Sequence, residues 1–425
     1  SCYLSIITKE LLMSTLQYDV IIFGATSFVG QILCKYIADN FNGEGKESLH
    51  WAIAGRSKSK LEEVKQRVGL SEIELLVADA NDESALRDLC IQTKVVVSTV
   101  GPYALYGEVL VKACAENGTD YCDLTGEVQW IYAMLNKYEQ SAKKSGARIV
   151  HSCGFDSIPS DLGVYFTQQQ AKKSQGEYCQ NIKMRVKAAK GGASGGTIAS
   201  MVNITKEAAK DPVLRKQLAN PYLICPSEAG YNVRQFNTNK PTWDEAFSAW
   251  TGPFVMAGIN TRIVFRSNAL AGSEYGADFT YDEAMLMGKD WKGCLGASAM
   301  VAGLGVFLLG VSLKPSRYLL ERYILPKPGA GPSPKEQVEG YYDLRFMGET
   351  STGKTVSTKV TGQGDPGYGS TSKMLGQAAA CLALDFYKGE KKTGKEGGFW
   401  TPASIFGDKL VGRLIEHADV TFEVL

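Results

Sequence analysis

The stretch Tyr18–Gly30, reading Y-D-V-I-I-F-G-A-T-S-F-V-G, decides the fold. Val20 to Phe23 form an uninterrupted apolar run, which is typical of a parallel strand buried on both faces. Gly24 follows at once, and residues 32–38 then carry apolar side chains at helical spacing. A strand, a glycine turn and a helix in this order form the context that a dinucleotide-binding fingerprint requires.

The residues of this turn fit the contacts of a bound pyrophosphate. Gly24 supplies the tight turn, Gly30 lets the helix pack close to the strand, and Ser27 stands where the backbone approaches the phosphate. Backbone N–H groups at the helix start then hold the anion. We therefore predict nucleotide binding by Gly24, Ala25, Thr26, Ser27, Phe28, Val29 and Gly30. The alternative is a structural turn without a ligand.

The second predicted strand, residues 51–54, indicates which nicotinamide cofactor is bound. In NAD-specific folds an acidic residue after this strand binds the ribose 2′-hydroxyl. Here Gly55 is followed by Arg56, Ser57 and Lys58. A guanidinium can bind a 2′-phosphate through two charge-assisted hydrogen bonds, so NADP(H) is favoured over NAD(H). Alternatively, Arg56 and Lys58 are solvated residues at the start of a helix over 59–68.

Two further strand ends complete the predicted cofactor site. Residues 73–78 form a third strand, and we expect Asp79 and Ala80 at its end to lie near the adenine. Residues 95–100 form a fourth strand, followed by Gly101, Pro102 and Tyr103. Loops at the carboxyl ends of parallel strands meet the ligand, so this turn is expected to wall the nicotinamide. Tyr106 is our candidate proton donor; the alternative is a plain turn with packed aromatics.

Other polar residues admit both catalytic and structural interpretations. Asp123 and Glu127 suit acid–base chemistry, or else a turn and a helix start. Cys153 lies close to His151 in sequence, but no third partner is evident, and a small buried residue is the favoured interpretation. Asp156 and Ser157 are expected to cap the helix that follows Pro159.

These motifs together resemble the saccharopine dehydrogenase-like oxidoreductases, a group that includes the mycobacterial trans-acting enoyl reductases. The matching segments are G-A-T-S-F-V-G at 24–30, A-G-R-S at 54–57, G-P-Y-A-L-Y-G at 101–107, D-L-T-G-E at 123–127, S-C-G-F-D-S-I-P-S-D-L-G at 152–163 and T-P-A-S at 401–404. Ser27 departs from the glycine that is usual in the family. The resemblance implies an α/β fold in which a Rossmann-type, doubly wound parallel sheet is interrupted by an α/β domain with a mixed sheet.

We expect four segments along the chain. Residues 1–12 precede Met13 and are interpreted as a leader or extension, and residues 13–150 as the Rossmann dinucleotide-binding domain. Residues 151–365 form a substrate or dimerisation domain. Within this domain, 191–197 is a glycine-rich anion cradle or a plain loop, 212–244 an irregular excursion, and 252–260 and 262–267 linings of the cleft. Residues 366–425 return to the Rossmann domain.

The segment 293–313 contains no charged residue and lies between Lys292 and Lys314. A helix of this length would reach about 30 Å, close to the thickness of a bilayer core. Its many small residues suit close helix packing. Three interpretations compete: a membrane anchor, an apolar lining for a lipid substrate or a homodimer contact, and an ordinary buried helix. The family resemblance favours a membrane or lipid surface.

Composition excludes several classes of function. Lys plus Arg total 46 and Asp plus Glu total 45, so no excess charge points to nucleic acid. Only 3 histidines are present, and we predict no metal site. The 10 cysteines include no Cys-x-x-Cys pair and are expected to be reduced thiols in an intracellular protein.

The function that we predict is NADP(H)-dependent reduction of a carbonyl or enoyl group in a hydrophobic, lipid-linked substrate at a membrane or lipid surface. The alternative is a membrane-associated nucleotide-binding scaffold with little catalysis. True saccharopine dehydrogenase activity ranks third, because its dicarboxylic substrate should require several cleft arginines that the sequence does not place.

Overall fold

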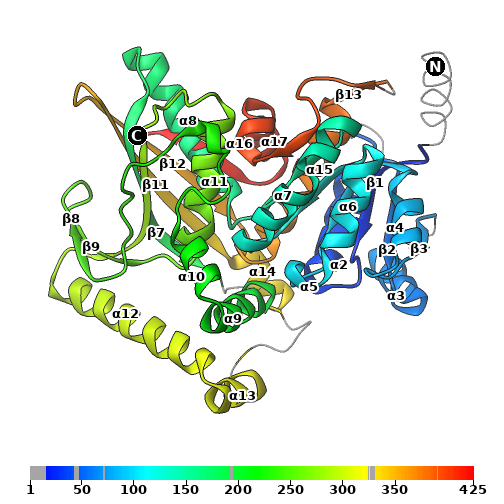
Figure 1. The fold of residues 1–425 in the computed structure, drawn as a ribbon, viewed down its shortest axis with the longest axis horizontal. Helices are drawn as coiled ribbons and strands as arrows, with labels where there is room; N and C mark the ends of the chain where they lie inside the picture. The colour runs from blue at the N-terminus through cyan, green and yellow to red at the C-terminus, as the bar shows by residue number, and fades with distance from the viewer. Residues whose placement is uncertain are drawn as a thin grey trace.

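The computed structural model describes residues 16–42, 47–69, 72–191, 195–323, 325, 331–389 and 391–425. Two seven-stranded sheets lie side by side and are surrounded by helices (Figure 1). The predicted leader, residues 1–12, lies outside the described residues, as does part of the predicted anion cradle at 192–194.

The first sheet is parallel throughout and has the strand order of a Rossmann fold extended by one strand. In spatial order its strands are β15 (Gly398–Trp400), β6 (Arg148–Val150), β5 (Asp120–Asp123), β4 (Thr93–Ser98), β1 (Tyr18–Phe23), β2 (Trp51–Gly55) and β3 (Glu74–Val77). The order reverses between β1 and β4. In open α/β sheets ligands bind beyond the strand ends at such a point.

Both faces of this sheet are covered, which explains the uninterrupted apolar run in β1. Val20 and Ile22 pack toward α2 (Phe28–Phe41), α3 (Lys58–Val68) and α15 (Gly369–Ala380). Ile21 and Phe23 face the opposite way, into the cluster formed by α4 (Glu83–Cys90), α6 (Glu108–Asn117) and α7 (Val128–Ser145). The sheet is therefore doubly wound, as the sequence predicts.

The second sheet is mixed. Its strands in spatial order are β16 (Val420–Val424), β12 (Thr355–Gln363), β11 (Tyr341–Thr350), β7 (Cys179–Lys190), β10 (Thr280–Gly288), β9 (Ala249–Pro253) and β8 (Thr242–Asp244). Strands β7 and β10 are parallel, whereas the other pairs are antiparallel. Alternate residues of β7, among them Ile182 and Met184, are buried beneath α8 (Ile158–Gln175) and its neighbours.

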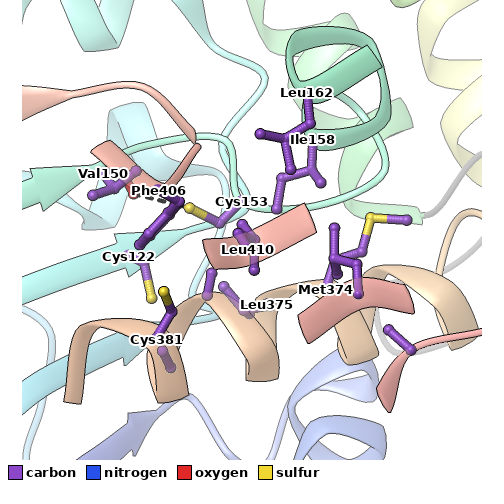
Figure 2. Close-up of a cluster of buried hydrophobic side chains, with 14 of the residues drawn as sticks. Cys122, Val150, Cys153, Ile158, Leu162, Met374, Leu375, Cys381, Phe406 and Leu410 are labelled. Atoms are coloured by element: carbon purple, nitrogen blue, oxygen red, sulfur yellow. Dashed lines mark hydrogen bonds between the residues drawn. The ribbon is translucent and has the colours of Figure 1, made fainter. Parts of the chain in front are cut away.

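A shared hydrophobic core connects the two sheets. Cys122 on β5 and Val150 on β6 lie near Ile158 of α8, together with side chains of α15, α16 (Pro402–Phe406) and α17 (Asp408–His417) (Figure 2). Residues 366–425 contribute to both sheets, because β15 pairs with β6 and β16 pairs with β12. The predicted fold class is confirmed; the domain bounds at residues 150 and 365 stay predictions.

The remaining elements lie around the two sheets and in the loops, and the π-helical turn at Cys381–Asp385 contacts β1 and β4 of the first sheet. They are α5 (Tyr103–Tyr106), α9 (Gly195–Lys210), α10 (Pro212–Ala219), a 3-10 turn (Ser227–Ala229), α12 (Trp291–Ser312), α13 (Lys314–Tyr323), α14 (Pro334–Glu339), a π-helical turn (Cys381–Asp385) and the hairpin of β13 (Tyr387–Lys388) and β14 (Lys391–Lys392). The expectation of irregular structure over 212–244 is partly wrong. Asp211 caps α10 and Pro212 begins it, an N-terminal signal that the polar composition obscured.

Helix α12 lies at the edge of the molecule and continues into α13 (Figure 1). Within the described residues it is the one helix long and apolar enough to cross a membrane, with a mean hydropathy of 2.1, and 11% of its most apolar stretch is buried. Trp291, Leu295, Val306 and Leu309 are each more than half exposed. The interpretation of 293–313 as an ordinary buried helix is therefore wrong.

Candidate functional site

A cavity of about 1060 Å³ opens where β1, β4, β5 and β6 end and reaches into the second domain. Its lining from the first sheet's loops comprises Ser27, Phe28, Val29, Thr99, Gly101, Pro102, Tyr103, Leu124, Gly126, Gly154, Phe155 and Asp156. The opposite wall comes mainly from α9, the residues before and within α11 (Ala257–Leu270), and the loop before α15. The cavity therefore occupies the topological switch point at which nucleotides bind in such sheets.

The turn between β1 and α2 has the geometry of a phosphate-binding turn. Gly24 has a φ of 91°, and a Cβ there would lie 2.6 Å from Val100 Cγ2. Ser27 caps α2, and its Oγ accepts a hydrogen bond from Gly30 N at 3.0 Å. The helix has no acidic residue in its first turn, and the N–H groups of that turn have no acceptor within the helix. An anion fits at this position.

Ser27 also anchors the turn to the next strand. Its Oγ lies 3.0 Å from Thr99 Oγ1, and Thr99 Oγ1 donates to Gly24 O at 2.9 Å. Ser27 therefore has a structural role: it caps the helix and connects β1 to β4. Of the seven predicted turn residues, Ser27, Phe28 and Val29 line the cavity, whereas Ala25 and Gly30 are buried behind them.

The predicted 2′-phosphate site lies at the neighbouring strand ends. Because β1, β2 and β3 are parallel neighbours, Arg56, Ser57 and Lys58 emerge at the same edge of the sheet as the phosphate turn, and so do Asp79 and Ala80. Arg56 is exposed and forms no hydrogen bond or ion pair with any residue that the structure describes. These residues lie outside the lining of the cavity. An unpaired guanidinium at this edge fits a 2′-phosphate.

We expect Arg56→Ala to weaken NADPH binding by about ten- to a hundredfold and to leave NADH binding unchanged. The physical reason is the loss of charge-assisted hydrogen bonds to the 2′-phosphate, which NADH lacks. Nicotinamide fluorescence titrations with both nucleotides measure the effect, with Arg87→Ala on α4 as a matched control. An equal loss for NADPH and NADH would remove the 2′-phosphate role of Arg56.

The loop after β4 is fixed by a buried carboxylate. Glu127 accepts hydrogen bonds from Tyr103 N at 2.8 Å, from Ala104 N at 3.1 Å and from Ser200 Oγ at 2.9 Å. Burial raises the pKa of Glu127, and these three donors act against the rise. Glu127 therefore positions the loop and connects it to α9. It lies outside the lining of the cavity, so the structure favours the structural interpretation.

The two tyrosines of the loop lie in different surroundings. Tyr103 lines the cavity, but its hydroxyl is occupied, since it donates to Ser98 O at 3.0 Å and accepts from Leu124 N at 3.1 Å. Tyr106 is 42% exposed and is not among the lining residues. The role of Tyr106 as proton donor stays a prediction, and Tyr106→Phe tests it.

His151 and Cys153 do not form a thiol–imidazole pair. His151 Nδ1 lies 2.7 Å from Asp123 Oδ2, and both residues are buried. The Cys153 thiol lies 3.5 Å from Val150 O, and burial raises its pKa well above the usual range. Cys153 is therefore a small buried residue, as expected. All cysteines in the described part of the chain are free.

Asp156 lies in the cavity and does not cap a helix. It was expected to cap the helix after Pro159, but α8 begins at Ile158 after Ser157, without a side-chain cap. Asp156 instead lines the cavity, where Thr197 of α9 donates a hydrogen bond to it. Burial raises the pKa of Asp156 from 3.8 to about 6. Among the lining residues of the described chain, it carries the only carboxyl group.

Asp156 is held at the junction of the two walls. Gly154 is packed so tightly that a Cβ would lie 2.7 Å from Leu124 Cδ2 and 3.2 Å from Thr371 Cγ2. Thr371 Oγ1 accepts a hydrogen bond from Phe155 N at 2.9 Å. Asp156 lies in the loop that follows the parallel strand β6 and contains Gly154, and this position is the signal that could have identified it from sequence.

The remaining wall of the cavity is largely apolar. Its side chains include Val128, Ile198, Met201, Val202, Ile204, Leu218, Phe254, Val255, Met256, Ile259, Met285 and Leu325. The predicted cleft segments 252–260 and 262–267 contribute through Phe254, Met256 and Arg262, among others. A ligand held here would bury apolar surface over most of its length.

Comparison with known proteins identifies the first domain. Residues 20–150 match the family model described as the saccharopine dehydrogenase NADP binding domain. Over 409 residues the chain is 38% identical to a Mycobacterium tuberculosis protein provisionally named as a trans-acting enoyl reductase, covering 94% of this chain and 95% of that protein. Over 411 residues it is 35% identical to the trans-acting enoyl reductase of Mycobacterium bovis, covering 94% and 96%.

Among solved structures, the apo saccharopine dehydrogenase (L-Glu forming) of Saccharomyces cerevisiae has the same fold. The TM-score is 0.53 at 12% identity, and the alignment covers 96% of this chain and 100% of that chain. This likeness confirms the fold alone. The matched domain confirms the prediction of NADP(H) as cofactor, and with the relatives it identifies the protein as an oxidoreductase.

Proposed function

The chain belongs to the family of the trans-acting enoyl reductases, and on that basis we propose that it reduces the carbon–carbon double bond of a hydrophobic enoyl substrate with NADPH. One observation carries this proposal. A single cavity joins the phosphate-binding turn of the NADP-binding domain to a long apolar wall and to one carboxyl group. A nucleotide, an apolar chain and a proton donor can therefore meet in it.

Different residues of the chain would bind the cofactor and the substrate. The start of α2 would hold the pyrophosphate, and Gly101 and Pro102 would border the nicotinamide. When bound, NADPH supplies the hydride. The apolar side chains of α9 and of the loop before α11 would hold the substrate chain and exclude water from the double bond. Glu127 keeps the Gly101–Tyr103 loop in place from behind.

Asp156 is placed to supply the proton. Reduction of an enoyl group adds a hydride to the β-carbon and a proton to the α-carbon. A general acid works best when its pKa lies near the operating pH, and burial brings the pKa of Asp156 to about 6. Its protonated carboxyl group donates the proton, and Thr197 orients it from α9.

An NADPH oxidation assay with 2-enoyl thioesters of increasing chain length tests this function. We expect turnover with NADPH and a KM that falls by about fourfold per added methylene until the apolar wall is covered, because each buried methylene contributes about 0.8 kcal/mol. Saturated thioesters of equal length are the control. Tight NADPH binding without consumption in the presence of any enoyl thioester or ketone would favour the scaffold alternative.

We propose further that α12 rests on a lipid surface. A helix that is apolar on all sides is normally buried, yet α12 is exposed along most of its length. Trp291 stands at its start and Tyr318 and Tyr323 follow its end, which is the pattern of aromatic residues at membrane interfaces. The nearby cations Lys289, Lys292, Lys314, Arg317 and Arg322 suit anionic headgroups.

Its position relative to the cavity supports a lipid-linked substrate. Helix α12 packs against α9, which forms a wall of the cavity, and Leu325 just beyond α13 also lines it. A substrate chain leaving a lipid layer at α12 would therefore meet the apolar wall of the cavity.

We expect the protein to float with vesicles containing anionic phospholipid and the double variant Val306→Asp, Leu309→Asp to lose this binding by at least about tenfold. An aspartate in the apolar layer costs about 2.5–3.5 kcal/mol at the centre of a span. Val338→Asp on α14, at a similarly exposed valine, is the matched control. Equal flotation of both variants, or no flotation of the wild type, would contradict the proposal. A wild type that is a dimer and a double variant that is a monomer would favour a homodimer contact at α12 instead.

A further inference from the structure

Arg262 on α11 is partly buried and, unlike the buried arginines, has no carboxylate partner among the residues that the structure describes. The buried arginines in the described chain each form an ion pair: Arg148 with Asp120, Arg185 with Asp244 and Asp282, Arg266 with Glu139, and Arg413 with Glu47 and Asp385. Arg266 lies one helical turn from Arg262 on α11, so the same helix contains a compensated and an uncompensated guanidinium. A charge that is shielded from water and has no counter-charge raises the free energy of the folded state, unless a ligand of opposite charge binds to it.

The hydrogen bonds of Arg262 leave part of its guanidinium unused. Nη2 donates to Leu218 O at 2.6 Å, and Nη1 approaches Thr261 Oγ1 at 3.4 Å. Its Nε is buried and has no acceptor in the described structure. Burial lowers the pKa of Arg262, and no carboxylate in the described part of the chain acts against this shift.

The side chain belongs to the cavity rather than to the core. Arg262 lines it together with Leu218, Met256 and Ile259, whereas the phosphate-binding turn comes from β1 and α2. Lys206 on α9 also lines the cavity, so its lining contains two cations and, in Asp156, one acid. The excess positive charge suits an anion in addition to an apolar chain.

We propose that Arg262 binds an anionic group, a phosphate ester or a carboxylate, carried by the substrate at a distance from its double bond. The proposal rests on the proposed function, because it describes the substrate of the same cavity. A guanidinium presents paired N–H groups that match both anions, and the ion pair is strong where water is scarce. The substrate is thus an amphiphile, with an apolar chain along α9 and an anionic group at α11.

Three enoyl thioesters with the same acyl chain test this site. They are the neutral pantetheine thioester, its phosphopantetheine counterpart and the mercaptopropionate thioester, which carries a carboxylate. We expect the wild type to bind at least one anionic thioester about ten- to a hundredfold more tightly than the neutral one. The thioester that binds more tightly shows whether the anionic group of the substrate is a phosphate ester or a carboxylate.

We expect Arg262→Met to reduce the ratio of anionic to neutral affinity to about one, and Arg262→Lys to keep part of the preference. Arg234→Met, at an exposed arginine outside the cavity, is the control and should keep all of it. The neutral thioester is the internal reference, and NADPH titration detects an effect on the nucleotide site. A wild type without preference, or an Arg262→Met variant that retains it, would overturn the proposal.

A second measurement separates this site from the reaction. Equilibrium binding of the three saturated acyl thioesters requires no turnover, and the same order of affinities is expected. If the preference persists and depends on Arg262 while no enoyl thioester is reduced, the proposed function is wrong and the anion site remains. If reduction proceeds without any preference, only the anion site is wrong.

Discussion

Gly30→Ala is expected to weaken NADPH binding by more than about a hundredfold. A Cβ at this position would lie 2.3 Å from Gly24 O and 2.8 Å from Ser27 Oγ. Because the nearest atom is backbone, the turn between β1 and α2 must open to accept the methyl group. The N–H groups of the first helical turn would then no longer converge on the pyrophosphate, and losing two charge-assisted hydrogen bonds costs about 3–6 kcal/mol.

Gly412→Ala is the matched control for this substitution. Gly412 lies within α17, and a Cβ there would meet no atom within 4 Å. This variant is expected to bind NADPH like the wild type and to gain up to about 1 kcal/mol of stability, because alanine is the better helix former. Fluorescence titration and thermal unfolding of both variants provide the comparison. A folded Gly30→Ala protein with unchanged NADPH affinity would show that α2 does not hold the nucleotide.

Asp156→Asn is expected to reduce kcat by about 10²–10⁴-fold, the usual contribution of a positioned general acid, and to leave the Kd for NADPH unchanged. An amide keeps the size of the side chain but has no acidic proton to give. In the wild type the pKa of Asp156 is raised to about 6, so the protonated acid is lost as the pH rises through that value. The rate of proton transfer should therefore fall above about pH 6.

Thr197→Val is a second test of whether Asp156 sets the pH dependence of the rate, because this variant should shift the profile without removing the acid. The Thr197 hydrogen bond stabilises the charged form of Asp156 and so lowers its pKa. Removing that bond should raise the pKa, and the falling limb of the profile should move to higher pH. Rates measured from acidic to alkaline pH for both proteins provide the comparison. An Asp156→Asn enzyme with full turnover, or a limb that stays in place in Thr197→Val, would assign the proton to another group, with Tyr106 as the next candidate.

Local sequence patterns predicted the first sheet well. The apolar run of Val20–Phe23 and the glycines at 24 and 30 place a strand, a turn and a helix within a few residues, and each depends on its immediate neighbours. Arg56 follows the second strand at the predicted sheet edge for the same reason.

The opposite wall of the cavity depends on contacts between distant residues, which local patterns do not contain. Asp156 looked like a helix cap because it precedes a proline by three positions, but its partner Thr197 lies on another element. The sequence around Arg262 and Arg266 does not show which of them has an acidic partner. In the folded protein Arg266 forms an ion pair with Glu139. The exposure of α12 was likewise undecided, since its composition fits a buried helix and a lipid-facing helix equally well.

The most direct test of the central claim is transfer of deuterium from NADPH, labelled at its hydride position, to a long-chain 2-enoyl thioester. We expect the wild type to form a saturated thioester with deuterium on the β-carbon and a solvent proton on the α-carbon, and the Asp156→Asn variant to form almost none. Recovery of unchanged enoyl thioester and fully labelled NADPH, from a protein that demonstrably binds the nucleotide, would contradict it.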